Sequence, residues 1–545
     1  MAQFGLAHQY GVLGAGGSNP LIPTICFLHH LNIIYISSLY KFRLYIDLIY
    51  WIFITRYRKR ELMGKIKFGT DGWRAVIAED FTFENLGYVV EAISLHLKKS
   101  GRWQKGVFIG YDNRFLSDYF SSHCSKILMK NGIRPYLPDT SVPTPATAYM
   151  IKELDLDGAL MITASHNPAK YSGIKFIPYY SGPAEDSITK EIEKNLETII
   201  AGNHKNNSVA NGSSVLSPVT VSDFSGYKAK LLELVDTSLI NEMRPRVTAD
   251  AMFGSGGKIF REIITENLGL DATFKNDYRD ALFGGMLPDP SRNNLANLKD
   301  MVLKNKMDIG LALDGDADRF GIIDGKGNYI SPNNAIAIIL YYLAENKRYA
   351  NGDIAVRTIA TTHLIDEIAA LNNIGILETP VGFKYICNAM LKGNVIIGGE
   401  ESGGLSIKGH IPEKDGLLAD LLILEIQSYL LKHQAGAYIT DYLDGIYKKH
   451  GYFYSTRIDM EIPNDKKDRV IEFFMDLKGK NIDGHKVVSI SDMDGARVTL
   501  ANKSWVLVRA SGTEPLIRCY IESMDKAYFD ILQSFIKSSV KLIIE

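Results

Sequence analysis

Short apolar runs rich in Val and Ile alternate with amphipathic stretches from Met63 onward. A buried strand that runs into a loop and then a helix, repeated several times, predicts a parallel α/β sheet. In such a sheet the functional residues collect at the carboxyl ends of the strands. In the first unit the pattern predicts a helix over residues 117–131 and strands over 107–112, 133–136 and 160–163.

The same alternation recurs in two further units, separated from the first by a polar stretch over 201–223 that reads as a linker. After Gly436 the pattern shifts, and residues 454–462 alternate like an antiparallel strand. We therefore expect three similar α/β domains and a smaller C-terminal α+β domain. The predicted limits are 63–222, 223–325, 326–435 and 436–545.

The predicted strands of the second and third units end at loops with unusual residues, as in the first. These strands cover residues 246–250, 309–313, 354–357 and 395–397, and a helix follows Ser331-Pro332. A further loop of this kind lies near the end of the chain. Four such loops from four domains can meet only in a cleft between the domains, so we expect the functional site there.

Residues 1–62 do not match the rest of the chain. We expect them to be an N-terminal extension outside the fold, with Met63 as the natural start, because strand-like sequence begins directly after it. A membrane anchor is the alternative, since residues 26–55 are largely apolar and a basic run follows. However, Lys41, Arg43 and Asp47 interrupt that run, and its longest charge-free piece has about 15 residues against the roughly 20 needed for a span.

Composition and charge narrow the function classes. Hydrophobic residues make up 46% and charged residues 23%, and 61 basic against 62 acidic residues give a net charge of −1. Because no global field attracts nucleic acid or an anionic membrane, we expect no nucleic-acid partner, and no membrane unless the extension is genuine. Any anion binding must therefore be local. The four cysteines form no CxxC, which argues against a disulfide framework or zinc site and favours a cytoplasmic location.

The segment Asp314-Gly315-Asp316-Ala317-Asp318-Arg319 places three carboxylates at alternate positions after a buried strand. A hard cation such as Mg²⁺ binds a few carboxylate oxygens and leaves sites for a phosphate oxygen. An EF-hand also begins D-x-D-x-D, but here its sixth position is Arg319 and its twelfth is Gly325, so that interpretation fails. A solvated acidic turn that binds no metal is the alternative, and the apolar runs on both sides argue against it.

Ser165 follows a predicted strand, in the segment Thr163-Ala164-Ser165-His166-Asn167-Pro168. As a hydrolase nucleophile it would use His166 as base, but a sequence neighbour rarely reaches the hydroxyl well, and no Gly-x-Ser-x-Gly elbow is present. As a phosphoryl carrier it would bear a phosphate that Mg²⁺ and nearby cations neutralise. The three-carboxylate loop favours the carrier, because a serine hydrolase has no use for a metal.

Two further segments suit a phosphorylated sugar. The run from Arg509 to Arg518 supplies two arginines, two hydroxyls and the turn at Gly512, which fits a dianionic phosphate. The loop Gly399-Glu400-Glu401-Ser402-Gly403-Gly404 offers carboxylates to sugar hydroxyls, although alone it is weak evidence. Lys384 lies on a restricted turn after Pro380.

Together these segments resemble the α-D-phosphohexomutase superfamily, which includes phosphoglucomutases, phosphomannomutases and phosphoglucosamine mutases. The motifs occur in the family's order from Met63 to the end: 69–74, 163–168, 314–319, 399–404 and 509–518. The resemblance implies three similar α/β domains around a deep central cleft. It also implies a fourth domain of a different, TATA-box-binding-protein-like fold.

The resemblance also implies roles for individual residues. Ser165 would carry the phosphoryl group and bind Mg²⁺ together with Asp314, Asp316 and Asp318. Charged or proton-relaying groups around the transferred phosphate would be Arg74, His166, Lys175 and Arg319. The substrate would contact Lys384, Glu400, Ser402, Arg509, Ser511, Gly512, Thr513 and Arg518. Lys175, Lys384 and His166 stay open as the general base.

The implied reaction has two phosphoryl transfers through a bisphosphorylated sugar, with hexose 1,6-bisphosphate as primer. The loop has Glu401 and Gly404 where phosphoglucosamine mutases usually carry Gln and His, so it is more similar to the phosphoglucomutase and mixed phosphoglucomutase/phosphomannomutase branches. Between these sugars we expect glucose phosphate. A phosphomannomutase or a dual-specificity enzyme is the first alternative. A phosphoglucosamine mutase, a metal-dependent phosphatase and a sugar-phosphate-binding protein without turnover are weaker ones.

Overall fold

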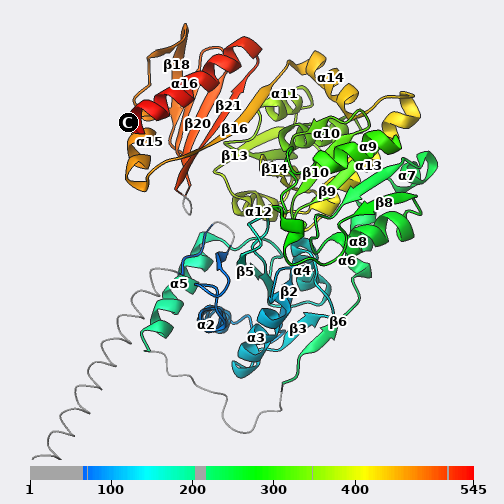
Figure 1. The fold of residues 1–545 in the computed structure, drawn as a ribbon, viewed down its shortest axis with the longest axis vertical. Helices are drawn as coiled ribbons and strands as arrows, with labels where there is room; N and C mark the ends of the chain where they lie inside the picture. Colours follow the sequence, from blue (N-terminus) through cyan, green and yellow to red (C-terminus); the bar gives the residue numbers. More distant parts are fainter. Residues whose placement is uncertain (1–65, 70–71, 203–215, 347, 512–514, 545) are drawn as a thin grey trace, which may run out of the picture. The chain divides into compact units, whose positions relative to one another are not determined.

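Four β-sheets with their covering helices organise the chain in a computed structural model that describes residues 66–69, 72–202, 216–346, 348–511 and 515–544 (Figure 1). The predicted extension over 1–62 and most of the predicted linker lie outside the described residues. Within the described ranges, no helix is both long enough and apolar enough to cross a membrane.

The first sheet has the strand order β1-β5-β4-β2-β3-β6. Strands β4, β2, β3 and β6 run parallel to one another. Strand β5 pairs antiparallel with β4, and β1 pairs antiparallel with β5. The strands are β1 (Trp73–Val76), β2 (Val107–Tyr111), β3 (Pro135–Pro138), β4 (Gly158–Ile162), β5 (Tyr171–Pro178) and β6 (Val219–Val221). Strand β6 lies inside the predicted linker, so that part of the prediction is wrong. This strand has only three residues, which are largely exposed at a sheet edge. It is therefore too short to show the alternation of buried and exposed positions that indicates a strand.

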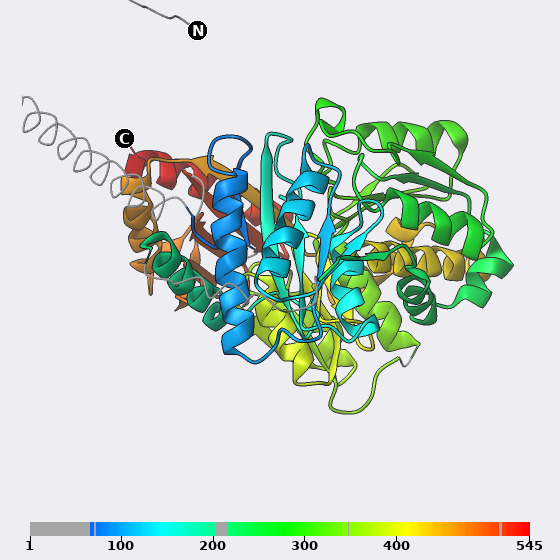
Figure 2. The ribbon, with the colours of Figure 1, turned by 90° about the horizontal axis from the view of Figure 1, so that it is seen from below.

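Helices α2 (Phe83–Lys99) and α5 (Asp186–Ile200) lie side by side in this unit (Figure 2). Thr82 caps α2 by accepting a hydrogen bond from the Asn85 backbone N–H, and Lys99 Nζ donates to Asn195 Oδ1 of α5 at 2.6 Å. The other helices are α3 (Ser117–Lys130) and α4 (Thr144–Glu153).

The second sheet has the order β11-β10-β9-β7-β8. Its strands are β7 (Val247–Asp250), β8 (Ala272–Lys275), β9 (Ile309–Leu313), β10 (Phe320–Asp324) and β11 (Tyr329–Ile330). Its helical segments are α6 (Ser225–Glu233), α7 (Thr237–Met243), α8 (Gly257–Arg261), η1 (Glu262–Asn267), η2 (Phe283–Gly285) and α9 (Ala296–Asn305).

The third sheet has the order β13-β12-β14-β15. Its strands are β12 (Ile354–Thr358), β13 (Gly375–Thr379), β14 (Val395–Glu400) and β15 (Gly404–Ile407). Its helices are α10 (Pro332–Glu345), α11 (Leu364–Leu371), α12 (Phe383–Leu391), α13 (Gly416–His433) and α14 (Ile439–His450). The domain limits stay predictions, but Tyr442 of α14 packs on Tyr341 of α10 with ring centroids 5.6 Å apart. We therefore propose that α14 belongs to the third unit.

The three sheets share one feature that positions the site. In each, a parallel strand is followed by an antiparallel neighbour, as the pairs β4–β5, β9–β10 and β14–β15. The turns of these three hairpins contain the Ser165 segment, the aspartate loop and the Glu400 loop. The functional loops are thus equivalent turns of a repeated unit.

The C-terminal sheet is antiparallel throughout, with the order β16-β21-β20-β19-β18-β17. Its strands are β16 (Tyr454–Glu461), β17 (Asn481–Ile482), β18 (His485–Ser491), β19 (Ala496–Leu500), β20 (Trp505–Ala510) and β21 (Leu516–Ser523). The segments η3 (Asn464–Lys466), α15 (Lys467–Met475) and α16 (Lys526–Ile544) accompany it. Its separate apolar core includes Val470, Phe474, Val498, Ile521 and Leu532. The predicted fold class is confirmed.

Candidate active site

Ser165 lies in the turn after β4 and is 2% exposed. Its backbone N–H donates to Thr163 Oγ1 at 2.8 Å, and its φ of 51° places it in the left-handed region. Ser165 Oγ lies 3.0 Å from Asp314 Oδ2 and 3.2 Å from His166 Nδ1. The expectation that His166 would not reach the hydroxyl is therefore wrong, because the turn folds the imidazole back over its neighbour.

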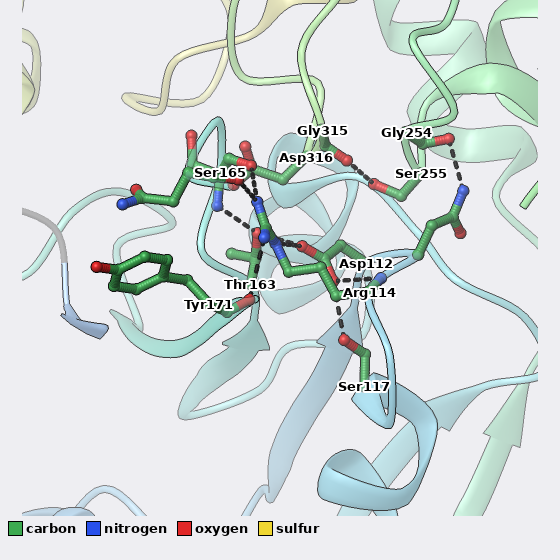
Figure 3. A network of polar contacts seen from close by, with 12 residues as sticks. Asp112, Arg114, Ser117, Thr163, Ser165, Tyr171, Gly254, Ser255, Gly315 and Asp316 are labelled. Atoms are coloured by element: carbon green, nitrogen blue, oxygen red, sulfur yellow. Dashed lines mark hydrogen bonds and ion pairs between the residues drawn. The ribbon is translucent and has the colours of Figure 1, made fainter. Parts of the chain in front are cut away.

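A buried arginine that sequence reasoning missed holds this turn in place. Arg114 donates to four backbone carbonyl oxygens, those of Ser165 (2.6 Å), Asn167 (2.7 Å), Pro168 (2.8 Å) and Tyr171 (3.0 Å). Its Nε also donates to Asp112 Oδ2 at 3.1 Å, and Asp112 in turn accepts from Thr163 Oγ1 at 2.7 Å (Figure 3). An aspartate and an arginine two residues apart after a buried strand were the available signal.

Asp314, Asp316 and Asp318 lie in the β9–β10 turn and are at most 1% exposed. One carboxylate oxygen from each lies within 4.8 Å of the others. Lys175 Nζ of β5 donates to Asp316 Oδ2 and Asp318 Oδ2, both at 2.9 Å. Asp316 Oδ1 and Asp318 Oδ1 are buried and have no hydrogen-bond partner among the described residues. Buried carboxylate oxygens without partners are costly, and a divalent cation would satisfy them.

The pKa values of Asp314 and Asp316 are shifted in opposite directions. Burial raises the pKa of Asp314 well above its usual range, and the charges of Asp316 and Asp318 raise it further. Burial acts in the same direction on Asp316, but the Lys175 charge and the Thr144 hydroxyl bond outweigh it and lower the pKa of that carboxyl. The Lys175 charge, together with hydrogen bonds to the ionised form of Asp316, explains this difference.

Burial also lowers the pKa of His166 well below its usual value, and the cations Arg319 and Arg74 add to this effect. The imidazole is therefore neutral at physiological pH, and its Nδ1 can accept a hydrogen bond from the Ser165 hydroxyl when the ring proton is on Nε2.

A cleft of about 770 Å³ adjoins this cluster and is lined by residues of all four sheet units. Such a volume suits a small ligand. Of the residues predicted from the sequence, the lining includes Arg74, His166, Arg319, Lys384, Glu400, Ser402, Arg509 and Arg518. The remaining described ones are not part of the lining surface: Ser165, Lys175, Asp314, Asp316, Asp318 and Ser511.

Cations line the cleft near the Ser165 turn. Arg74 Nη1 of β1 donates to Asn167 Oδ1 at 3.0 Å, and Arg319 Nη1 lies 3.5 Å from Asp289 Oδ1. Lys414, which sequence reasoning missed, lines the cleft with its Nζ 3.1 Å from Asp318 Oδ2. Its loop lies far from the aspartates in sequence, so no local pattern pointed to it.

The β14–β15 turn presents hydrogen-bonding groups to the same cleft. Ser402 Oγ donates to Glu400 Oε1 at 2.7 Å, and Glu400 Oε2 is buried without a partner among the described residues. Such an oxygen can accept a hydrogen bond from a ligand hydroxyl. Lys384 Nζ of α12, in the third unit, lies 2.5 Å from Asp186 Oδ1 of α5, in the first unit.

The predicted phosphate loop follows β20. Arg509 Nε donates to Asp494 Oδ2 at 2.8 Å, and the Ser511 backbone N–H donates to the Leu516 carbonyl at 3.0 Å. Gly512 and Thr513 lie outside the described residues. Arg457 and Tyr520 are among the lining residues of this domain that were not predicted.

Comparison with known proteins identifies the family. The models of the phosphoglucomutase/phosphomannomutase α/β/α domains I, II and III match residues 65–202, 225–327 and 331–449, and the model of the C-terminal domain matches 465–537. A phosphoglucomutase/phosphomannomutase of Thermococcus kodakarensis is 30% identical over 89% of this chain and 99% of its own length.

Two further proteins agree. A phosphoglucosamine/phosphogalactosamine mutase of Sulfurisphaera tokodaii is 28% identical over 88% of this chain and 100% of its own. The crystal structure of a candidate phosphomannomutase from Thermus thermophilus has a TM-score of 0.73 and 28% identity, covering 88% of this chain and 99% of that one. The chain therefore belongs to the phosphoglucomutase/phosphomannomutase family of the α-D-phosphohexomutase superfamily, as its sequence motifs predicted.

Proposed function

We propose that the chain interconverts glucose 1-phosphate and glucose 6-phosphate, with Ser165 as the phosphoryl carrier and glucose 1,6-bisphosphate as primer. Membership of the family makes the chain a phosphohexomutase, and the proposal adds the sugar, the carrier and the primer. The contact of Ser165 Oγ with Asp314 Oδ2 at 3.0 Å, beside two more buried aspartates, carries the proposal.

The first half-reaction transfers the phosphoryl group from Ser165 to the sugar. The attacking sugar hydroxyl forms a new O–P bond, the bond from phosphorus to Ser165 Oγ breaks, and a base accepts the hydroxyl proton. In the second half-reaction Ser165 Oγ attacks the other phosphate of the bisphosphorylated sugar, and the isomeric monophosphate leaves.

The cluster around Ser165 would hold and neutralise the transferring group. When bound by Asp314, Asp316, Asp318 and the Ser165 phosphate, Mg²⁺ would offset negative charge on that group. Arg74 and Arg319 would contact its outer oxygens from the cleft side. His166, 3.2 Å from Ser165 Oγ and held neutral, supports a role in proton transfer, while Lys175 is engaged by two aspartates.

The Glu400 loop supports glucose over glucosamine. A Cβ at Gly404 would lie 2.5 Å from Lys414 Cδ, so this loop has no room for a side chain there while Lys414 keeps its position. The His that phosphoglucosamine mutases carry at that position would displace Lys414 from Asp318. Dual specificity for glucose and mannose is the second candidate, favoured by the Thermococcus kodakarensis relative, whose name carries both sugars.

Initial rates on the 1-phosphates of glucose, mannose and glucosamine, each primed with its 1,6-bisphosphate, test the sugar. We expect glucose to exceed mannose by about 10-fold, because an epimeric hydroxyl changes binding by one or two hydrogen bonds, and glucosamine to be slowest. Equal rates on glucose and mannose would establish the dual enzyme. Net release of inorganic phosphate without isomerisation would overturn the proposed function.

Arg114→Lys should impair both folding and turnover. A lysine cannot span four carbonyls and Asp112, so we expect a loss of about 3 kcal/mol in the free energy of unfolding. Misplacement of the Ser165 turn should lower kcat about 100-fold. Urea denaturation and initial rates measure these effects. Arg102→Lys, an exposed arginine over the Tyr179 ring, is the matched control and should change neither. An Arg114→Lys chain with normal kcat would contradict the positioning role.

The buried thiols Cys124, Cys387 and Cys519 support a reducing environment, in line with a cytoplasmic location.

A further inference from the structure

The two faces of the C-terminal sheet differ in character. On β21 the residues Ile517, Cys519 and Ile521 face the core of this domain. Side chains alternate along a strand, so Arg518 and Tyr520 lie on the opposite face. That face packs on the third unit through Trp505, Leu507 and Tyr520 and lines the cleft.

Strand register places three arginines on this second face. Arg457 of β16 is paired with Tyr520, and Arg509 of β20 is paired with Arg518. Directly paired residues of an antiparallel sheet point to the same side. The three arginines therefore share one surface on three adjacent strands, and all three line the cleft.

Arg457 is held in place but remains accessible. Its Nε lies 3.0 Å from Asp459 Oδ1, and its side chain is 45% exposed. The Glu401 carboxyl of the third unit interacts electrostatically with Arg457, whose charge acts to lower the pKa of that carboxyl. Arg457 thus lies close to the Glu400 loop on the same sheet face as Arg509 and Arg518.

We propose that Arg457 is a third phosphate-binding arginine, which contacts the same phosphate as Arg509 and Arg518 in the C-terminal domain. The ligand class is a dianionic phosphate monoester on a hexose, so the inference rests on the proposed function for its substrate. A phosphate dianion presents three acceptor oxygens, and guanidinium groups from three strands can satisfy them from different sides.

This role predicts a specific kinetic pattern. In the two half-reactions the phosphate at carbon 1 and the phosphate at carbon 6 each occupy the C-terminal site once. Loss of Arg457 should therefore raise KM for both monophosphates by the same factor and leave kcat nearly unchanged, because uniform binding is lost. A residue that contacted sugar hydroxyls would change the preference among sugars instead.

Calorimetric titration of glucose 6-phosphate tests the inference independently of turnover when every variant carries Ser165→Ala. We expect Arg457→Met to weaken binding about 10-fold and Arg457→Lys to recover part of that loss, as for one charge-assisted contact. Inorganic phosphate, used as a competitor without a sugar, should lose affinity by a similar factor. Arg469→Met removes an exposed arginine of α15 outside the cleft and should leave binding unchanged.

Binding by Arg457→Met within twofold of the Ser165→Ala parent would overturn the inference, as would a loss confined to the sugar and absent with inorganic phosphate. A thermal unfolding midpoint equal to that of the parent confirms that the variant is folded, and Arg457→Lys provides a second folded variant. If the unmodified chain fails to isomerise glucose phosphates but Arg457→Met still weakens phosphate binding, the proposed function falls and the Arg457 assignment stands.

Discussion

Replacing Ser165 by alanine should remove turnover almost completely. Because in the proposed mechanism every catalytic cycle begins with the phosphoryl group on Ser165 Oγ and ends with its return, we expect kcat to fall by at least about 10⁴-fold. The change removes one buried oxygen that contacts Asp314 and His166, so the fold should persist. A coupled assay that detects glucose 6-phosphate formed from glucose 1-phosphate measures the loss.

Ser187→Ala is the matched control, because this serine is exposed on α5 of the same unit, outside the cleft lining. It should retain normal kcat. Substantial activity in the Ser165→Ala chain, with its near-ultraviolet circular dichroism unchanged, would show that another group accepts the phosphoryl.

Asp318→Asn should have the second largest effect. It keeps the side-chain shape but removes one charge from a cluster in which Asp316 Oδ1 and Asp318 Oδ1 have no hydrogen-bond partner among the described residues. We expect kcat to fall about 100- to 1,000-fold, comparable to the loss of one electrostatic contact to a transition state. The apparent Mg²⁺ affinity should fall at the same time, and a titration of activity against Mg²⁺ measures it.

Chelation provides the matching experiment on the unchanged chain. EDTA should reduce turnover to background, and added Mg²⁺ should restore it. Asp300→Asn, an exposed aspartate on α9 of the same unit, should leave the Mg²⁺ titration unchanged. Full activity in EDTA would mean that the three aspartates serve only to hold Lys175 and Lys414.

The sequence predicted the groups that follow strands and have unusual residue types. Three carboxylates directly after an apolar strand, as at Asp314, Asp316 and Asp318, fit neither a hydrophobic core nor an ordinary exposed turn. The local sequence was therefore enough to predict a metal site there. The role of Ser165 was predicted with the help of a second motif far along the chain. The three-aspartate loop favours a phosphoryl carrier over a hydrolase nucleophile. The contact between the two motifs at 3.0 Å depends on the fold, and sequence alone implied it only through the resemblance.

Arg114, Lys414 and Arg457 were missed for a common reason. Each is a single cation in an ordinary stretch, and its role depends on partners distant in sequence. The spacing of Asp112 and Arg114 was a local signal, but the carbonyl partners of Arg114 become known only once β5 places the Tyr171 carbonyl beside it. Arg457 is recognisable only through its register with Tyr520.

The most direct test of the central role of Ser165 is to follow one phosphate. The chain is incubated with labelled glucose 1,6-bisphosphate, freed of ligand, digested and mapped by mass spectrometry, and a second portion is first chased with unlabelled glucose 6-phosphate. We predict one labelled phosphate on the peptide that contains Ser165, and its transfer to glucose 1,6-bisphosphate during the chase. Label on another residue, or its release as inorganic phosphate during the chase, would contradict the account.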